Sequence, residues 1–286
     1  MFAVAKRKPD WLRRRFVADP NLALTENILG DLRLNTVCAE ALCPNYTECF
    51  SKKTATFMIL GVYCTRNCGF CNVTHGNPET ADPGEPARIG EAVARLGLKH
   101  VVVTSVTRDD LPDGGARSFA DTVSEIRRRS PGVAVEILIP DFGGNEEALD
   151  IVASSRPDVI AHNMETVKSL YATVRPLAEY ERSLRVIEEV KDRAPTARSK
   201  SGIMVGLGET KAEVMSLMDD LRGAGCEFLT IGQYLAPSAE HLAVVEYIRP
   251  ETFEEYAEIA RDKGFAFTAS APFVRSSYRA EEAMRA

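Results

Sequence analysis

Residues 56–71 have the sequence TFMILGVYCTRNCGFC, in which an apolar run leads directly into a polar loop with three cysteines. The run Phe57–Tyr63 is rich in β-forming residues, and it predicts a buried strand. From this strand onward, short β-rich runs alternate with amphipathic stretches. The further predicted strands are His100–Val106, Ala134–Ile139, Val159–His162, Gly202–Gly206 and Phe228–Gln233.

Amphipathic helices are predicted between these strands, and most of them end at glycine or proline. Their predicted bounds are Ile89–Leu96, Arg117–Arg129, Glu146–Ser154, Tyr180–Arg193, Ala212–Gly223 and Pro250–Lys263. Six alternations of strand and helix imply a parallel sheet, closed or partly closed into a barrel. We therefore expect an α/β fold, a partial (β/α)6 TIM-like barrel over residues 56–264. Residues 1–55 are expected to form an N-terminal extension, with a short helix near Leu22–Leu32, and residues 265–286 a C-terminal tail.

The overall composition, with 45% hydrophobic and 27% charged residues, is ordinary for a globular protein. The net charge of −6 argues against a general nucleic-acid binder. No apolar run reaches the roughly 20 residues of a membrane helix, and the N-terminus lacks the apolar core of a secretory signal. We therefore expect a cytoplasmic protein without a membrane partner. The basic residues Lys6–Lys8 and Arg13–Arg15 are either a solvated terminal segment or a docking patch for an acidic partner.

Cysteine is the residue type that points most directly to chemistry. The chain has seven cysteines, six of them between positions 38 and 71, whereas Cys226 stands alone and is predicted to be a small buried residue. A cytoplasmic chain of this size does not need disulfides, so the clustered cysteines are interpreted as metal or cluster ligands.

The motif Cys64-x3-Cys68-x2-Cys71 can bind three irons of a cubane 4Fe–4S cluster and leave the fourth iron open. A zinc site is the alternative, but zinc takes four ligands, and two groups of three cysteines would each be one ligand short. The spacing resembles that of the radical SAM superfamily. There the open iron binds S-adenosylmethionine, and one-electron reduction yields methionine and a 5′-deoxyadenosyl radical.

A second group, Cys38-x4-Cys43-x5-Cys49, is a weak pattern by itself. Beside the first motif it resembles the lipoyl synthase family, in which this spacing holds an auxiliary 4Fe–4S cluster that supplies sulfur. The resemblance runs from about Lys8 to Ala280. The stretches that carry it are residues 34–38, 54–61, 103–111, 138–142, 162–167, 230–235 and 274–278.

The resemblance also implies a serine ligand for the fourth iron of the auxiliary cluster. It comes from the segment Arg275–Tyr278, where we expect Ser277 to bind, with Ser276 as the alternative. An alkoxide is harder and more exchangeable than a thiolate, which suits a cluster that must release sulfur. Three departures from the family pattern leave every ligand in place: Lys53 and Ala271 stand where glycine is common, and Phe50 where tryptophan is usual.

Several residues are candidates for binding S-adenosylmethionine. Asn163 and Glu165 lie two apart on a strand, so they share a face and could hydrogen-bond ribose hydroxyls, although a simple polar strand end is the alternative. The pattern Gly202-x-Met204-x-Gly206-x2-Glu209 resembles the strand that supports adenine in the superfamily, or is an ordinary turn. The remaining candidates are Arg175 and Lys200 for the methionine carboxylate, and Ser105 and Thr107 for other polar contacts. His162 is assigned no role.

The resemblance implies a sulfurtransferase that inserts two sulfur atoms at C6 and C8 of a protein-bound octanoyl group, in lipoate biosynthesis. A saturated chain has no acidic proton, so hydrogen-atom abstraction replaces acid–base chemistry. The implied catalytic residues are Cys64, Cys68, Cys71 and Ser277, and the implied cofactors are two 4Fe–4S clusters and S-adenosylmethionine. The implied partners are an octanoylated lipoyl carrier domain, either the E2 component of a 2-oxo acid dehydrogenase or the glycine-cleavage H protein, and an electron donor such as ferredoxin or flavodoxin.

The competing hypotheses are a sulfur inserter resembling biotin synthase, an iron–sulfur electron carrier and a zinc-dependent interaction module.

Overall fold

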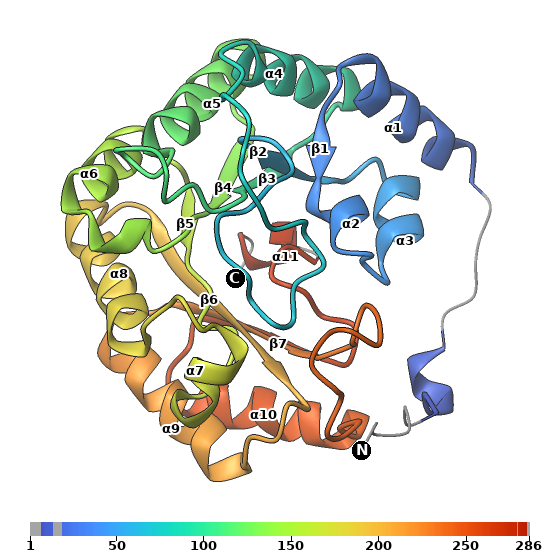
Figure 1. Ribbon diagram of the computed structural model, residues 1–286, viewed down its shortest axis with the longest axis vertical. Helices are drawn as coiled ribbons and strands as arrows, with labels where there is room; N and C mark the ends of the chain where they lie inside the picture. Colours follow the sequence, from blue (N-terminus) through green and yellow to red (C-terminus); the bar gives the residue numbers. More distant parts are fainter. Residues whose placement is uncertain (1–6, 14–18, 279, 285–286) are drawn as a thin grey trace.

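The computed structural model describes residues 7–13, 19–278 and 280–284, which contain one open sheet of eight strands surrounded by helices (Figure 1). The strands are β1 (Asn35–Thr36), β2 (Thr56–Ile59), β3 (His100–Ser105), β4 (Ala134–Leu138), β5 (Val159–Ala161), β6 (Arg198–Val205), β7 (Phe228–Gln233) and β8 (Phe267–Ser270). They lie side by side in chain order. The β1–β2 pair is antiparallel and every other neighbouring pair is parallel, so the loops that follow β2 to β8 emerge at one end of the sheet.

Helices connect the parallel strands and cover the outside of the sheet (Figure 1). The helices are α1 (Pro20–Asp31), α2 (Val37–Glu40), α3 (Tyr46–Ser51), α4 (Glu85–Leu96), α5 (Ala116–Arg129), α6 (Glu146–Ser154), α7 (Tyr171–Val174), α8 (Tyr180–Arg193), α9 (Lys211–Gly223), α10 (Pro250–Asp262) and α11 (Ala280–Ala283). Short 3-10 turns lie at Asp10–Leu12, Phe142–Gly144 and Lys168–Leu170. Within the described residues, no helix combines the length and the apolar character needed to cross a membrane. Of the basic N-terminal residues, Lys6, Arg14 and Arg15 lie outside the described part of the chain.

The predicted fold class, a partial α/β barrel, is confirmed, and the six predicted strands correspond to β2 through β7. The two edge strands were not predicted. β1 has only two residues, and the four residues of β8 are all partly exposed, so neither strand has the fully buried apolar run that marks β2 and β5. Because β8 pairs with β7, the segment predicted as a C-terminal tail begins inside the sheet.

The helices bury one face against the sheet, as their sequence period requires. In α5, Phe119, Val123 and Ile126 recur every three or four residues and are fully buried. At the opposite end from the strand-end loops, Ala283 of α11 packs with residues from the starts of β5, β7 and β8. This end of the barrel is therefore closed by apolar packing, and the polar loops lie at the other end.

Lys53, one of the departures from the family pattern, has a φ of 57°. This left-handed conformation favours glycine, because a Cβ crowds the backbone there. The structure thus gives a physical reason why glycine is common at this position.

A fully buried ion pair crosses the barrel interior between β4 and β6. The Nζ atom of Lys200 lies 2.7 Å from Oε1 of Glu136, and both side chains are 1% exposed. His100 places its Nε2 3.4 Å from the other carboxylate oxygen. Burial acts to raise the pKa of Glu136, but the charge of Lys200 and the contact with His100 outweigh it and lower the pKa. The ammonium group of Lys200 is therefore engaged in an ion pair with Glu136.

Replacing Lys200 with methionine is expected to lower the free energy of unfolding by about 3–5 kcal/mol, because the change leaves the Glu136 carboxylate buried without a counter-charge. The double variant Lys200→Met with Glu136→Leu should lose much less, since both charges are then gone. Urea titration of the iron-free protein measures both values. A single variant that is no less stable than the double variant would contradict the buried pair.

Candidate active site

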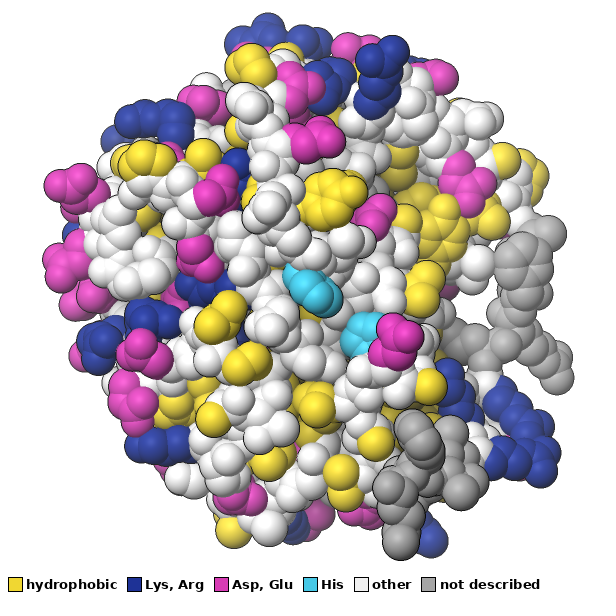
Figure 2. Space-filling model, in the orientation of Figure 1, with side chains coloured by type: hydrophobic (Ala, Val, Ile, Leu, Met, Phe, Trp, Pro, Cys, Tyr) yellow, Lys and Arg dark blue, Asp and Glu magenta, His cyan; other side chains and the backbone are white. Residues whose placement is uncertain are grey.

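One cavity of about 450 Å³ opens among the loops at the carboxyl ends of the strands. Both cysteine groups contribute to its lining: Cys38 and Cys43 from the first, and Cys64, Cys68 and Cys71 from the second. Figure 2 shows the face that carries α2, α3 and the loop after β2. On this face, charged side chains gather mainly at the periphery, while apolar and uncharged ones fill the centre.

The loop with Cys64, Cys68 and Cys71, here called the cysteine loop, is held by backbone hydrogen bonds to three neighbouring segments. The Thr65 amide donates to Thr107 after β3 (3.0 Å), and the Gly69 amide donates to Val174 at the end of α7 (3.0 Å). On its other side, Gly69 accepts a bond from the Leu242 amide (3.1 Å). These contacts fix the course of the loop independently of its cysteines.

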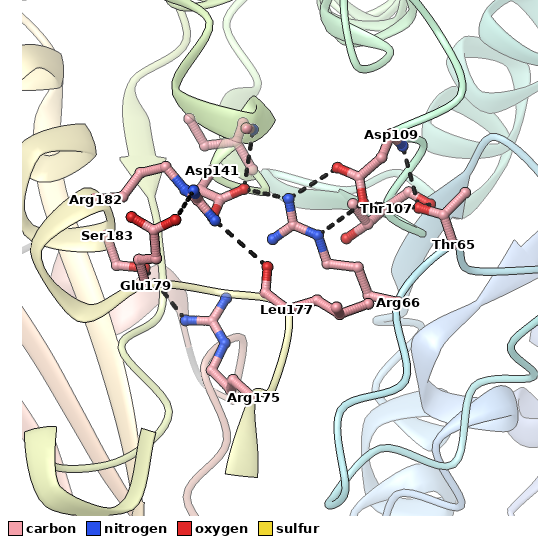
Figure 3. A network of polar contacts seen from close by, with 12 residues as sticks. Thr65, Arg66, Thr107, Asp109, Asp141, Arg175, Leu177, Glu179, Arg182 and Ser183 are labelled. Carbon is pink, nitrogen blue, oxygen red and sulfur yellow. Dashed lines mark hydrogen bonds and ion pairs between the residues drawn. The ribbon is translucent and has the colours of Figure 1, made fainter. Parts of the chain in front are cut away.

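A charged network adds a second anchor to the cysteine loop (Figure 3). Arg66 donates through two nitrogens to Asp109, at 2.9 and 2.8 Å, and also to Asp141, at 2.6 Å. The second oxygen of Asp141 accepts a bond from Arg182 of α8 at 2.8 Å. Asp141 is completely buried, which acts to raise its pKa, but the hydrogen bonds and charge of Arg66 prevail and hold the pKa well below its usual range. Asp141 is therefore a carboxylate shared by two arginines from different elements.

The first cysteine group lies on short helices in front of the sheet. Cys38 belongs to α2 and Cys49 to α3, and the Cys43 amide donates to the Cys38 carbonyl (3.1 Å). The Cys49 side chain does not line the cavity, but burial and the nearby sulfurs of Cys38 and Cys43 raise its pKa to about 12. The three sulfurs therefore form one electrostatically coupled group.

The tail after β8 passes beside the first cysteine group, and its two candidate serines contact different residues. Ser277 accepts a 2.7 Å hydrogen bond from the hydroxyl of Thr56, which also contacts the Cys38 sulfur. Ser276 instead donates to Oδ1 of Asn163 at 3.1 Å. The side chains of adjacent residues thus lie at different parts of the cavity, with Ser277 beside the first cysteine group.

Four residues predicted to bind S-adenosylmethionine line the cavity together: Ser105, Asn163, Glu165 and Arg175. The Asn163 amide donates to Glu165 (3.0 Å), and Nη1 of Arg175 donates to the Asn163 carbonyl (2.9 Å). Burial raises the pKa of Glu165, against the charge of Arg175. Glu165 also has a φ of 67°, a strained value for a residue other than glycine.

Two further observations characterise this part of the cavity. A Cβ added to Gly202 would lie 2.7 Å from the Thr230 hydroxyl and 2.9 Å from Oδ1 of Asn163, so glycine allows these two side chains to pack directly on the strand. The Ser105 hydroxyl and Nε of Arg175 are buried without any protein partner. Lys200 is the predicted contact that the structure does not bring to the cavity, because its ammonium group pairs with Glu136 instead.

The donor set fits iron–sulfur clusters. Burial raises the pKa of Cys38 to about 11 and that of Cys71 to about 12, so these thiols need positive charge beside them to ionise, which iron would supply. In the described part of the chain, no three acidic, histidine or cysteine side chains converge on a single metal position. A cubane binds each thiolate through a different iron, so it does not require such convergence.

No role was predicted from the sequence for Arg66, Arg182 or Thr56. Asp141 belongs to the stretch 138–142 that carries the family resemblance, but no contact was predicted for it. The contacts of these residues join segments far apart in the chain, and no local sequence pattern predicts them. Arg66 and Asp141, for example, are 75 positions apart.

Comparison with known proteins identifies the family. The family model described as Radical SAM superfamily matches residues 58–221. The chain is 56% identical to the lipoyl synthase of Alkaliphilus metalliredigens over 98% of this chain and 96% of that protein. It is also 56% identical to the lipoyl synthase of Caldicellulosiruptor saccharolyticus, over 96% and 97% of the two chains.

Solved structures share the fold at low sequence identity. Streptococcus suis SuiB bound to S-adenosylmethionine matches with a TM-score of 0.60 and 12% identity, over 79% of this chain and 54% of that longer one. Methylornithine synthase matches with a TM-score of 0.55 and 12% identity, over 91% and 85% of the two chains. At these identities the likeness concerns the partial barrel alone.

Replacing Asp141 with asparagine is expected to lower the free energy of unfolding by about 3–5 kcal/mol, because two arginines lose their buried counter-charge. The matched change Asp109→Asn removes a partly exposed partner of the same Arg66 and should cost at most about 1 kcal/mol. Urea titration of the iron-free variants measures both. Equal losses for the two variants would show that burial of Asp141 is not the decisive feature.

The pH dependence of this stabilisation follows from the lowered pKa of Asp141. A depressed folded pKa stabilises at every pH above the unfolded value of about 3.9, and the stabilisation is lost as the pH falls through the folded pKa. The difference in unfolding free energy between the wild type and Asp141→Asn should therefore be constant from about pH 5 to 8. A difference that declines between pH 7 and 5 would contradict this assignment.

Proposed function

The chain belongs to the lipoyl synthase family of radical SAM enzymes, and from this premise we propose how its own residues carry out the family's reaction. That reaction inserts two sulfur atoms, at C6 and C8, into a protein-bound octanoyl group. The enzyme is a sulfurtransferase that uses S-adenosylmethionine and 4Fe–4S clusters. The observation that carries the proposal is that both cysteine groups line one cavity.

Cys64, Cys68 and Cys71 are the proposed ligands of the cluster that binds S-adenosylmethionine. When bound, this pair supplies a 5′-deoxyadenosyl radical, and the auxiliary cluster supplies the sulfur. Arg66 holds the cysteine loop in place through Asp109 and Asp141.

Asn163, Glu165, Arg175 and Ser105 are the proposed contacts of S-adenosylmethionine. Nη1 of Arg175 is already engaged with Asn163 and with Tyr171, which leaves its buried Nε as a donor for the ligand. Glu165 and Asn163 hydrogen-bond each other, so each holds the other in position. Gly202 keeps the approach to Asn163 free of a side chain.

Cys38, Cys43, Cys49 and Ser277 are the proposed ligands of the auxiliary cluster. The position of Ser277, joined to Thr56 and so to Cys38, supports it over Ser276. A serine alkoxide exchanges more readily than a thiolate, as a cluster that releases its sulfur requires.

The proposed substrate is an octanoylated lipoyl carrier domain, from the E2 component of a 2-oxo acid dehydrogenase or the glycine-cleavage H protein. Apolar side chains in the cavity, among them Met58, Leu138 and Leu235, suit a saturated acyl chain. The proposed electron donor is a ferredoxin or a flavodoxin, and the proposed location is the cytoplasm.

The test of this function uses anaerobically reconstituted protein with dithionite, S-adenosylmethionine and an octanoyl-lysine peptide. Mass spectrometry should detect a gain of two sulfur atoms, with about two 5′-deoxyadenosines per product, because each sulfur needs one hydrogen abstraction. Deoxyadenosine without sulfur insertion would exclude this substrate. No deoxyadenosine from a fully loaded protein would point to an electron carrier.

A matched pair of variants should show which of the two serines is a ligand of the auxiliary cluster. Ser277→Ala is expected to reduce sulfur insertion by about 10- to 100-fold through loss of a cluster ligand, and to change the Mössbauer spectrum of the auxiliary cluster. Ser276→Ala should leave that spectrum unchanged. Ser277→Cys should keep the iron content but slow sulfur transfer, because a thiolate exchanges less readily. The opposite pattern would assign the ligand to Ser276.

A further inference from the structure

His162 is a buried residue at the cavity that the proposed mechanism does not use. It follows directly after β5, is 2% exposed and lines the cavity. Its Nδ1 lies 2.9 Å from the carbonyl oxygen of Ile139, at the end of the neighbouring β4. Its Nε2 is buried and has no partner.

The contact with Ile139 determines the tautomer of the imidazole. A carbonyl oxygen can only accept, so Nδ1 must carry the proton and donate it. In a neutral ring, Nε2 then has a lone pair and can only accept. Burial, with the charge of Arg175, lowers the pKa of His162 to about 4. The ring is therefore neutral at physiological pH and presents an acceptor.

The charged groups around His162 favour the neutral imidazole and indicate where in the cavity the residue lies. Arg175, after α7, and Arg66, in the cysteine loop, both disfavour a second positive charge on the ring, while Asp141, after β4, favours it. The same two arginines also act on the thiol of Cys68. His162 therefore lies on the side of the cavity that faces the cysteine loop.

A buried acceptor without a partner is unfavourable, and most such groups in folded proteins are satisfied. We propose that Nε2 of His162 accepts a hydrogen bond from an N–H or O–H group of S-adenosylmethionine bound at the cysteine loop. S-adenosylmethionine carries such donors in its ammonium group, its adenine amino group and its ribose hydroxyls. His162 is then a specificity residue that acts as an acceptor throughout the reaction and never as an acid. This inference rests on the proposed function.

The test is equilibrium binding of S-adenosylmethionine to the oxidised, cluster-loaded enzyme, without reductant or octanoyl peptide. His162→Asn keeps a donor for the Ile139 carbonyl but lacks the acceptor, and it should raise the Kd about 3- to 10-fold, the value of one neutral hydrogen bond. His162→Gln places an amide oxygen near the position of Nε2 and should recover most of the affinity. His100→Asn, which removes a largely buried histidine that does not line the cavity, is the matched control and should bind like the wild type.

Nitrogen-15 NMR of histidine-labelled, iron-free protein gives a readout that does not depend on the clusters. Among the four histidines, the signals of His162 are those lost in His162→Asn, and they should show Nδ1 protonated and Nε2 unprotonated at pH 7. A protonated Nε2 would overturn the proposal even if none of the variants could be loaded with clusters.

The binding outcomes are equally distinct. A normal Kd for His162→Asn overturns the inference, whether or not its KM for the octanoyl peptide rises. A wild type that produces deoxyadenosine and lipoylated peptide, yet shows no effect of His162→Asn on the Kd, keeps the proposed function and removes only the role of His162. A wild type that binds no S-adenosylmethionine overturns both.

Discussion

The buried carboxylate of Asp141 is the interaction on which the rest of the site depends. It follows β4 and is balanced by Arg66 from the cysteine loop and by Arg182 from α8. A charge without partners in this position would be strongly unfavourable, so the loop, the strand end and the helix are stable only together. These protein contacts therefore fix the position of the cysteine loop without any contribution from iron.

In contrast to this network, the cavity wall contains buried polar groups that lack hydrogen-bond partners. Nε of Arg175, the Ser105 hydroxyl and Nε2 of His162 are all buried at its wall and have no protein partner. The thiols nearby have raised pKa values because burial disfavours their charged form. A satisfied outer network and an unsatisfied interior are what a preorganised binding site requires, because the ligand then meets groups that need no rearrangement to bind it.

The sequence predicted much of the fold because apolar residues recur regularly in β2 through β7 and in the helices between them. It predicted the cysteine ligand candidates because their spacing is local. It failed where partners are distant in the chain. Lys200 stood outside the predicted strand Gly202–Gly206, but β6 begins at Arg198, so Lys200 is an interior strand residue and pairs with Glu136 on β4. Strand limits and register, which local periodicity leaves undetermined by a few residues, decided where that side chain points.

The tail after β8 connects the two halves of the site, and this explains why it must pass so close to the sheet. A Cβ on Gly232 of β7 would lie 2.1 Å from the carbonyl oxygen of Val274, so the tail packs directly on the strand. From there, Ser276 bonds Asn163 and Ser277 bonds Thr56. Two adjacent residues thus join the proposed S-adenosylmethionine pocket to the first cysteine group. Both serines lie in a turn that is closed by a 3.0 Å hydrogen bond from the Tyr278 amide to the Arg275 carbonyl. Because this turn directs the two adjacent side chains to different partners, a change in its backbone would disturb both contacts together.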